Sequence, residues 1–469
     1  MEKAKAKERE LPREILIAAW AIALGAIAPM LDSTMVNIAI DILTKDFHTT
    51  LDIIQWAITG YVLALAMAVP VSGWLMNHFN GKKIFIGAVA AFGIISVLVG
   101  LSWNISSFIF FRLLQGFSAG IITTLMFTLL VKTAGPNYLG RVMAIVSTPM
   151  IFGPILGPVI GGFIVQGASW QWIFFINVLV VLIAAPLMIR RIPDFEPFNK
   201  ESKLDGFGIV CLSLMSAAFI YGITKAAEHA SFHNHETLNW VGIGLALAVM
   251  YLAYNRFRRN QTVLPLNLFT HRNYLASSVG LFLANMAIMG PMLILPLFFQ
   301  NFRHFTAIEA ALALIPQGVG MLVTRPLIGK MIDRIGAKYV VMVSLVLSLI
   351  GSIPLIFITN RTSMVWISLV LFIRGTSVGG INLPLTSDAY TGLDDHHLPE
   401  AGVGINIIEN LGASFGSAVI ATVVATVVQG VQPTIANGLK GYHAGFLVSA
   451  LILILIFIPG LFLTHKRNA

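Results

Sequence analysis

The chain has 469 residues, of which 57% are hydrophobic and only 11% are charged, with a mean hydropathy of +0.84. Soluble proteins carry about 25% charged residues, so the composition excludes an ordinary soluble protein. The net charge of +9 does not indicate nucleic-acid binding, because the basic residues lie mainly in short loops between apolar runs. Cys211 is the sole cysteine, so no intrachain disulfide is possible.

Apolar runs of about 20 residues, long enough to cross a ~30 Å hydrocarbon core, recur along the whole sequence. The charged N-terminal tail leads into a long apolar run with no cleavage site, which is typical of an uncleaved first span. The predicted spans are 15–41, 52–77, 84–102, 105–131, 140–166, 170–189, 205–224, 238–255, 273–299, 308–331, 339–358, 364–390, 401–428 and 443–464.

The distribution of basic residues predicts the orientation of these fourteen spans. The two tails and the connections after even-numbered spans hold 22 Lys and Arg residues, whereas the other connections hold 5. Three arginines, Arg112, Arg325 and Arg374, lie inside spans. Since Lys and Arg accumulate on the cytoplasmic side, both termini are expected to be cytoplasmic.

A weak internal repeat divides the chain. The loop after span two contains Gly73 and Asn77, and the loop after span ten contains Gly329 with Asp333 and Arg334 at the matching positions. We interpret both as gating loops, because such repeats are common in secondary transporters. The predicted organisation is a cytoplasmic tail (1–14), a six-helix bundle (15–190), a linker with an inserted helix pair (191–257), a second six-helix bundle (258–464) and a C-terminal tail (465–469).

Asp32 is the first ionisable residue that needs an explanation, since a charge at the centre of a membrane helix costs about 2.5–3.5 kcal/mol on insertion scales. Ser33 and Asn37 form a polar strip beside it in span one. A buried acid with a raised pKa suits a carrier that exchanges a proton for a cation. The alternative is a structural hydrogen bond between helices.

Two further sites carry charge inside spans. Arg112, with Gln115 three residues later in span four, can hold a nearby carboxylate or extend to the membrane surface. Glu409 in span thirteen shares a helical face with Asn406 and with small residues, so it either lines a cavity or clamps two helices. Arg325 and Asp388 are weaker candidates for gate or interface residues.

Span five carries a backbone motif, with glycines at four-residue spacing that permit close helix packing and prolines that kink the helix. It consists of Gly153, Pro154, Gly157, Pro158, Gly161 and Gly162. The chain has no P-loop or other enzyme motif, and its paired histidines occur in loops without metal-ligand spacing. We therefore expect a secondary transporter with no metal and no cofactor other than protons as the coupling ion.

These motifs resemble those of the fourteen-spanner drug:proton antiporters of the major facilitator superfamily. The likeness covers almost the whole chain except spans seven and eight. It rests on Leu31-Asp32, Val36-Asn37, Gln55-Trp56 with Tyr61, Arg112 with Gln115-Gly116, the glycine–proline run of span five, Trp172 to Asn177, Leu295-Pro296 to Gln300, and Ile315-Pro316-Gln317-Gly318.

The resemblance implies a major facilitator fold and proton-coupled export of lipophilic, cationic drugs by alternating access across a bacterial cytoplasmic membrane. Asp32, Glu409 and Arg112 are the expected coupling residues. The expected substrate-binding residues are Asp32, Asn37, Trp56, Tyr61, Gln115, Asn406 and Glu409. The lipid bilayer and small lipophilic or cationic substrates are the expected partners, nucleic acid is not, and an accessory protein is not predictable.

The sequence departs from the family pattern at two places. Asn77-His78 replaces the usual Asp-Arg pair, so a charge lock is expected only at the second copy. Glu409 falls where arginine is common, which predicts a more acidic cavity. Two other functions fit the same residues: a proton-coupled exporter of a metabolite, amino acid or lipid, and a transporter-like sensor or scaffold without flux.

Overall fold

The computed structural model describes residues 11–465 except 201–203, 260 and 429–434, and every regular element in this part is helical. Before the linker lie α1 (Arg13–Gly25), α2 (Ile27–Asp46), α3 (Leu51–Ile54), α4 (Trp56–His78), α5 (Gly81–Gly100), α6 (Ile105–Gly167) and α7 (Trp172–Arg191). The pair α8 (Gly206–Glu228) and α9 (His235–Phe257) follows.

After the pair come η1 (Leu266–Thr270), α10 (Arg272–Arg303), α11 (Ala307–Ala313), α12 (Ile315–Ile335), α13 (Ala337–Ser352), η2 (Ile353–Phe357), α14 (Met364–Ala389), η3 (Asp395–His397), α15 (Leu398–Val428), α16 (Ile435–Leu455) and α17 (Phe457–Gly460).

Several predicted spans contain breaks that hydropathy does not reveal. Span one is divided at Ala26 into α1 and α2, and span ten at Leu314 into α11 and α12. Conversely, the predicted spans four and five belong to one long helix, α6, which is interrupted at Gly135, where φ is 61° and ψ is 178°. Only glycine adopts this backbone region readily, so Gly135 is the point at which the two helical arms of α6 meet.

Twelve helical segments among the described residues are long and apolar enough to cross a membrane. The stretches 140–166 and 308–331 are helical but are not among the twelve. The break at Leu314 shortens the second stretch, and α12 itself contains Arg325, Lys330, Asp333 and Arg334. The all-helical membrane architecture is therefore established, while the count of fourteen stays a prediction.

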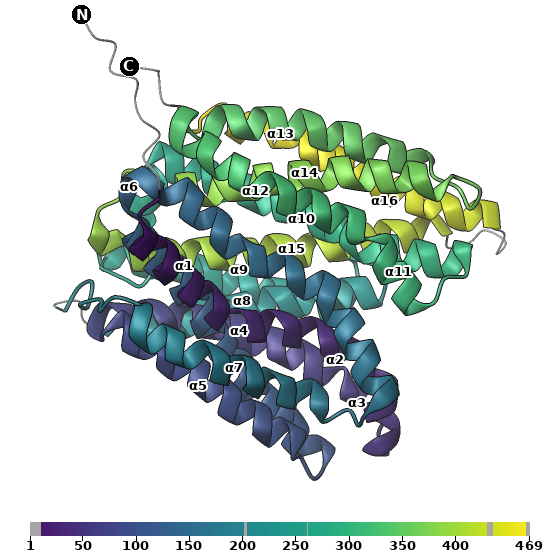
Figure 1. The fold of residues 1–469 in the computed structure, drawn as a ribbon, viewed down its shortest axis with the longest axis horizontal. Helices are drawn as coiled ribbons and strands as arrows, with labels where there is room; N and C mark the ends of the chain where they lie inside the picture. Colours follow the sequence, from purple (N-terminus) through teal and green to yellow (C-terminus); the bar gives the residue numbers. More distant parts are fainter. Residues whose placement is uncertain (1–10, 201–203, 260, 429–434, 466–469) are drawn as a thin grey trace, which may run out of the picture.

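The helices form two groups with the pair α8 and α9 between them (Figure 1). Helices α1–α7 lie on one side and α10–α16 on the other. Helix α8 packs against α4 and α15, one from each group. Ser213 Oγ donates to the carbonyl of Met67 at 2.8 Å, and Thr422 Oγ1 donates to that of Ala226 at 3.4 Å. Such bonds satisfy hydroxyl groups that have no water in the bilayer interior.

Asp205 holds together the end of this pair at which α8 begins and α9 ends. Its Oδ1 accepts hydrogen bonds from the Gly208 amide at 2.9 Å, as an N-cap of α8, and from Tyr254 Oη at 2.6 Å. Its Oδ2 accepts from the Val263 amide at 3.0 Å. One carboxylate thus joins α8, α9 and the connection to α10, so the pair is attached to the linker as a unit.

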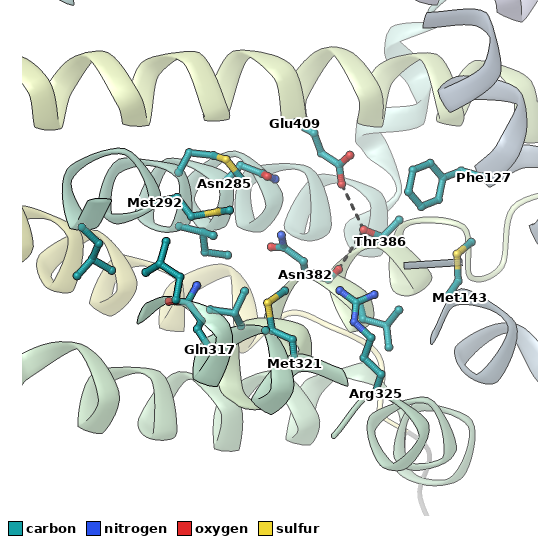
Figure 2. Close-up of a pocket in the computed structure, with 17 residues that line it drawn as sticks. Phe127, Met143, Asn285, Met292, Gln317, Met321, Arg325, Asn382, Thr386 and Glu409 are labelled. Carbon is teal, nitrogen blue, oxygen red and sulfur yellow. Dashed lines mark hydrogen bonds between the residues drawn. The ribbon is translucent and has the colours of Figure 1, made fainter. Parts of the chain in front are cut away.

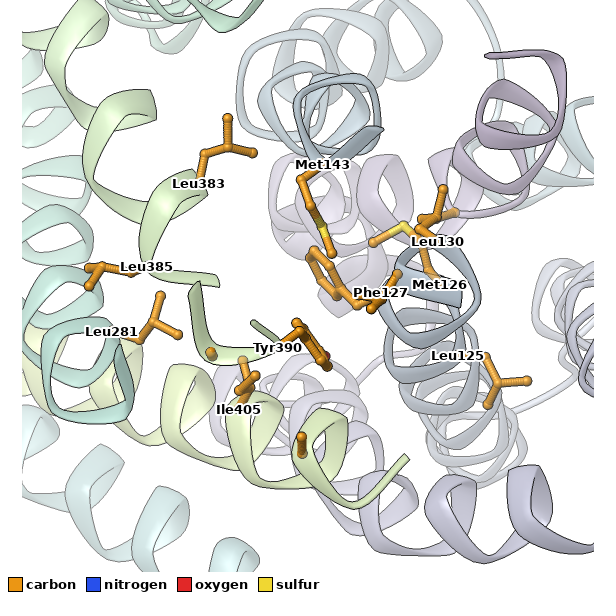
Figure 3. Close-up of a cluster of buried hydrophobic side chains, with 14 of the residues drawn as sticks. Leu125, Met126, Phe127, Leu130, Met143, Leu281, Leu383, Leu385, Tyr390 and Ile405 are labelled. Carbon is orange, nitrogen blue, oxygen red and sulfur yellow. The ribbon is translucent and has the colours of Figure 1, made fainter. Parts of the chain in front are cut away.

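A cluster of buried apolar side chains fills the contact between the two groups (Figure 3). Phe127 and Met143, from the two arms of α6, lie near Tyr390 at the end of α14. Leu383 of α14 and Ile405 of α15 belong to the same cluster. Because these side chains come from both groups, their burial excludes water from the space between them at this level of the bundle.

Replacing Gly135 with alanine should lower the stability of the purified protein in detergent by about 1–3 kcal/mol, since alanine is strained at this φ and ψ. The measurement is thermal unfolding. Gly87 is the matched control: it is exposed within α5, and an added Cβ there meets nothing within 4 Å. Gly87→Ala should leave stability unchanged or raise it by up to about 1 kcal/mol. Equal unfolding temperatures for wild type and Gly135→Ala would contradict the claim that the backbone at Gly135 requires glycine.

Candidate functional site

Asp32 and Arg112 form an ion pair that is fully enclosed by the first group of helices. Arg112 Nη1 lies 2.5 Å from Asp32 Oδ2, and the two side chains are 1% and 0% exposed. Asn177 Nδ2 of α7 donates to Asp32 Oδ1 at 2.8 Å, and Gln115 Nε2 lies 3.3 Å from the same atom. All of these groups donate, so the geometry fits an ionised carboxylate.

The guanidinium of Arg112 is held on every side. Its Nε donates to the Ala57 carbonyl of α4 at 3.1 Å, and Nη1 also donates to Gln115 Oε1 at 2.6 Å. The Tyr61 ring lies 4.3 Å from its central carbon, and the Phe174 ring lies 5.7 Å away. A desolvated arginine between two aromatic faces gains cation–π stabilisation. The pair therefore links α2, α4, α6 and α7.

A separate cavity of about 190 Å³ lies mainly among α10, α12, α14 and α15, with α6 contributing two side chains (Figure 2). Most of its lining is apolar and flexible, and it includes four methionines: Met143, Met289, Met292 and Met321. Unbranched methionine side chains adapt to irregular ligands. The cavity is thus suited to lipophilic molecules of more than one shape.

Polar groups occupy one side of this cavity. Glu409 of α15 is half-buried, and its Oε1 lies 3.3 Å from the hydroxyl of Thr386. That hydroxyl also lies 3.0 Å from the Asn382 carbonyl. Arg325 of α12 points into the cavity from the side opposite Glu409 (Figure 2). An acidic and a cationic side chain therefore share this cavity.

Ion pairs join the two groups at one end of the bundle, which we call the terminal end. It is the end at which Leu11 lies near Lys330, and Thr464 bonds to Lys338. Arg141 Nε lies 2.8 Å from Asp333 Oδ2, and the Gly140 amide donates to Asp333 Oδ1 at 2.8 Å.

Two further contacts reinforce this end. Lys132 pairs with Asp395 across the two groups, and the ring of His396 bonds to the Phe198 carbonyl. Asp388 nearby accepts hydrogen bonds from Thr464. At the first copy of the repeat, Asn77 is buried and its side-chain oxygen has no partner among the described residues. The charged contact thus occurs at the second copy.

The glycines of the span-five motif face α2 at close range. A Cβ added at Gly153 would lie 2.7 Å from the Met30 carbonyl oxygen, and one added at Gly161 would lie 3.1 Å from that of Met35. A Cβ added at Gly157 would clash with Thr34. The Thr34 hydroxyl donates a hydrogen bond to the Gly153 carbonyl at 2.8 Å. Gly162 is buried, and the side chains of Pro154 and Pro158 lie outside the described part. Backbone-to-backbone contact therefore depends on these glycines.

The repeat glycines also mark close contacts. An added Cβ at Gly73 would lie 2.6 Å from Val403 of α15, and one at Gly329 would lie 2.8 Å from the Gly140 carbonyl oxygen. Arg334 is exposed. Both glycines therefore let helices of the two groups approach each other.

The predicted substrate-binding residues do not converge on the cavity. Of that set, only Glu409 lines it. Tyr61 and Gln115 belong to the buried Asp32 network, Asn37 is exposed, and Trp56 lines a different groove between α4 and the inserted pair. Asn406 is buried and donates to the Gly402 carbonyl at 2.9 Å. The span-one acid and the span-thirteen acid thus occupy two distinct environments.

Sequence reasoning missed several polar residues of these sites. The sequence shows Asn177 only as the last residue of the motif that begins at Trp172. A lone amide in an apolar span can nevertheless indicate a buried hydrogen-bond donor. Thr386 and Asn382 occur in a span in which the charged residues Arg374 and Asp388 are more prominent. No group of three or more potential metal ligands occurs among the described residues.

An all-helical membrane bundle around an apolar cavity, with a charged network enclosed in one half, is an arrangement typical of membrane transporters. The chain belongs to the Major Facilitator Superfamily, whose family model matches residues 22–417. It is a multi-pass cell-membrane protein.

Relatives and a solved structure place the chain within this superfamily. It is 31% identical over 87% of its length to the multidrug resistance protein B homolog of Mycobacterium tuberculosis, covering 76% of that protein. It is 26% identical to the multidrug export protein EmrB of Escherichia coli, over 87% of this chain and 80% of the relative. The human organic anion transporter MFSD10 shares the fold, with a TM-score of 0.65 and 14% identity over 96% of this chain and 100% of that one.

Replacing Asp333 with asparagine should open the terminal end more often, because asparagine cannot form the ion pair with Arg141. We expect a cysteine placed at Met143, in a Cys211→Ser background, to react severalfold faster with a water-soluble maleimide. Asp194→Asn is the matched control, since Asp194 is 74% exposed and lies 3.9 Å from Lys82. Surface pairs of this kind contribute about 0–1 kcal/mol. Unchanged labelling in Asp333→Asn would contradict a gating role.

Proposed function

We propose that this protein is a proton-coupled exporter of lipophilic compounds, working by alternating access across a bacterial cytoplasmic membrane. The observation that carries the proposal is the separation of two sites: an enclosed Asp32–Arg112 pair suited to proton exchange, and an adaptable apolar cavity suited to substrate. The names of the relatives, which are multidrug resistance and export proteins, support drugs as substrates.

We further propose the fourteen-spanner drug:proton antiporter architecture, with two six-helix bundles, an inserted pair and both termini in the cytoplasm. The bias of 22 to 5 in basic residues supports this orientation. The position of α8 between α4 and α15 supports treating the pair as an insertion. On this orientation, the terminal end with its ion pairs is the cytoplasmic end.

In the proposed cycle Asp32 is the coupling acid and Arg112 is its counter-charge. Protonation of Asp32 removes the negative charge from the pair, so Arg112 is left buried without compensation. Losing one partner of a buried pair costs about 3–5 kcal/mol. That free energy is large enough to favour a different packing of α2 against α6 and α7. Proton binding can thereby select one of the two access states.

Asp32→Asn should abolish efflux driven by a pH gradient, because the amide cannot exchange a proton. It keeps an oxygen acceptor for Asn177. The measurement is dye transport in proteoliposomes, with substrate counterflow in the absence of a gradient as the test of folding. We expect counterflow to persist. Ser33→Ala is the neighbouring control, since Ser33 bonds only to the Met30 carbonyl of its own helix. Coupled efflux by Asp32→Asn at the wild-type rate would refute the assignment.

Glu409 is proposed as the acid that meets substrate. When it is ionised, the Thr386 hydroxyl can donate to it at 3.3 Å. When it is protonated, it can donate to Thr386, which then donates to the Asn382 carbonyl. Both protonation states have a hydrogen-bond partner, so a proton can be exchanged without leaving a polar group unpaired.

A second titrating acid also changes the energetics. Exchange of two protons for one monovalent cation moves one net charge, and the membrane potential then contributes about 2.3 kcal/mol per 100 mV. This corresponds to a further concentration gradient of roughly fiftyfold. A single proton exchanged for the same cation would gain nothing from the potential.

Glu409→Gln should reduce export of lipophilic cations at least about tenfold and export of neutral compounds much less, because only the cations lose an attractive charge. Ethidium and a neutral dye, compared in the same vesicles, measure the difference. Glu228→Gln provides a control carboxylate, since Glu228 forms a surface pair with Lys225. An equal loss for both substrates would count against this role for Glu409.

A further inference from the structure

Arg325 is a buried cation that no residue in the described part of the chain neutralises. Its side chain is only 6% exposed. Its Nε and Nη1 atoms are enclosed and have no hydrogen-bond partner among the described residues, and it forms no ion pair with any of them. Buried charges in proteins are normally paired. An arginine left open in this way is prepared for a partner that the chain itself does not supply.

The surroundings direct the guanidinium toward the cavity. Arg325 precedes Pro326 in α12 and packs beside Gly379 of α14, where an added Cβ would lie 3.8 Å from Arg325 Cγ and 4.0 Å from Nε. These are ordinary van der Waals distances, so Gly379 lies directly against the arginine side chain. Figure 2 shows the guanidinium pointing into the cavity below Asn382 and Thr386.

Neighbouring charges increase the local positive potential. Arg374, also fully buried, donates from Nη1 to Gln317 Oε1 at 3.1 Å, and its Nε has no partner. Gln317 lines the same cavity as Arg325. Two buried arginines thus lie in this half of the described chain without an ion-pair partner. The contrast with Arg112, which Asp32 neutralises, is complete.

The cavity also has a negative pole. Glu409 and Arg325 lie on opposite sides of it in Figure 2, and the four methionines and Phe127 belong to the lining between them. Among the described residues these two side chains form no ion pair with each other. A ligand that satisfied both would carry an anionic group toward α12, a cationic group toward α15, and an apolar body between them.

We propose that the cavity recognises lipophilic compounds that carry a carboxylate, above all zwitterions, and that Arg325 determines this specificity by binding the carboxylate. The planar guanidinium matches a carboxylate with two parallel hydrogen bonds. The proposal rests on the proposed export function and narrows its substrate class: a lipophilic cation engages Glu409 alone, whereas a zwitterion engages both poles.

The test uses two dyes that differ in one group. Tetramethylrhodamine carries a free carboxylate, and its methyl ester has the same ring system without that charge. Binding of each to the purified full-length protein is measured by fluorescence anisotropy, and transport of each in proteoliposomes. Wild type, Arg325→Gln, Arg325→Lys and Glu409→Gln are compared, with Arg361→Gln as a control because Arg361 is exposed.

Arg325→Gln is expected to weaken binding of the free acid at least about tenfold, equivalent to about 1.4 kcal/mol, while binding of the ester changes less than about twofold. Arg325→Lys should fall between wild type and Arg325→Gln, since lysine keeps the charge but not the planar fork. This variant also serves if Arg325→Gln does not fold. Glu409→Gln should weaken binding of the ester at least as much as it weakens binding of the free acid.

Three outcomes overturn the proposal. The wild-type protein does not bind the free acid, or the Arg325 variants lose binding of the acid and the ester equally, or these variants bind both dyes as the wild type does. Failure of the underlying export function is distinguishable, because wild-type vesicles would then transport neither the dyes nor ethidium. Retained ethidium export in a variant with unchanged acid binding would reject the carboxylate site alone.

Discussion

A charge inside a membrane protein must find a partner, and the placement of Asp32 and Arg112 follows from that constraint. The guanidinium uses the Ala57 carbonyl of α4, the carboxylate uses Asn177 of α7, and Gln115 of α6 bonds to both members of the pair. Gln115 also donates to Ser96 of α5 at 2.7 Å. Every helix of the first group from α4 to α7 therefore contributes to neutralising one pair with α2. A change in the charge of Asp32 therefore alters the hydrogen bonds that connect all of these helices.

The second group repeats the backbone pattern but not the charge. Arg374 occupies a position like that of Arg112, near the start of a span and followed by small residues, yet its described partner is the side-chain oxygen of Gln317. Arg325 adds another cation, and Glu409 lies across the cavity. The two halves are thus specialised: the first has internally balanced charge, and the second leaves charges for a ligand to balance. An internal repeat in sequence does not imply equal chemistry in both copies.

The sequence predicted most of the helices, because the bilayer requires long apolar runs. The cost of intramembrane charge drew attention to Asp32, Arg112 and Glu409, and the structure places the first two in one ion pair and the third beside the cavity. Their roles stay predictions. The sequence could not predict which helices meet. Asn177 lies 145 residues from Asp32 along the chain, and nothing in local composition indicates that contact. The motif that contains Trp56 likewise does not indicate that this residue lines a groove formed with α8 and α9.

The inserted pair can bridge the two halves without locking them together. Its contacts with α4 and α15 include one hydroxyl-to-carbonyl bond on each side, at 2.8 Å through Ser213 and 3.4 Å through Thr422. Bonds of this kind contribute about 0.6 kcal/mol on average in membrane proteins, far less than the ~3–5 kcal/mol at stake when a buried ion pair loses one partner. In the proposed cycle, protonation of Asp32 therefore involves more free energy than these two hydrogen bonds supply. Since the shorter bond is the one to α4, and Asp205 holds α8 and α9 together, the pair is expected to move with the first group and slide along α15.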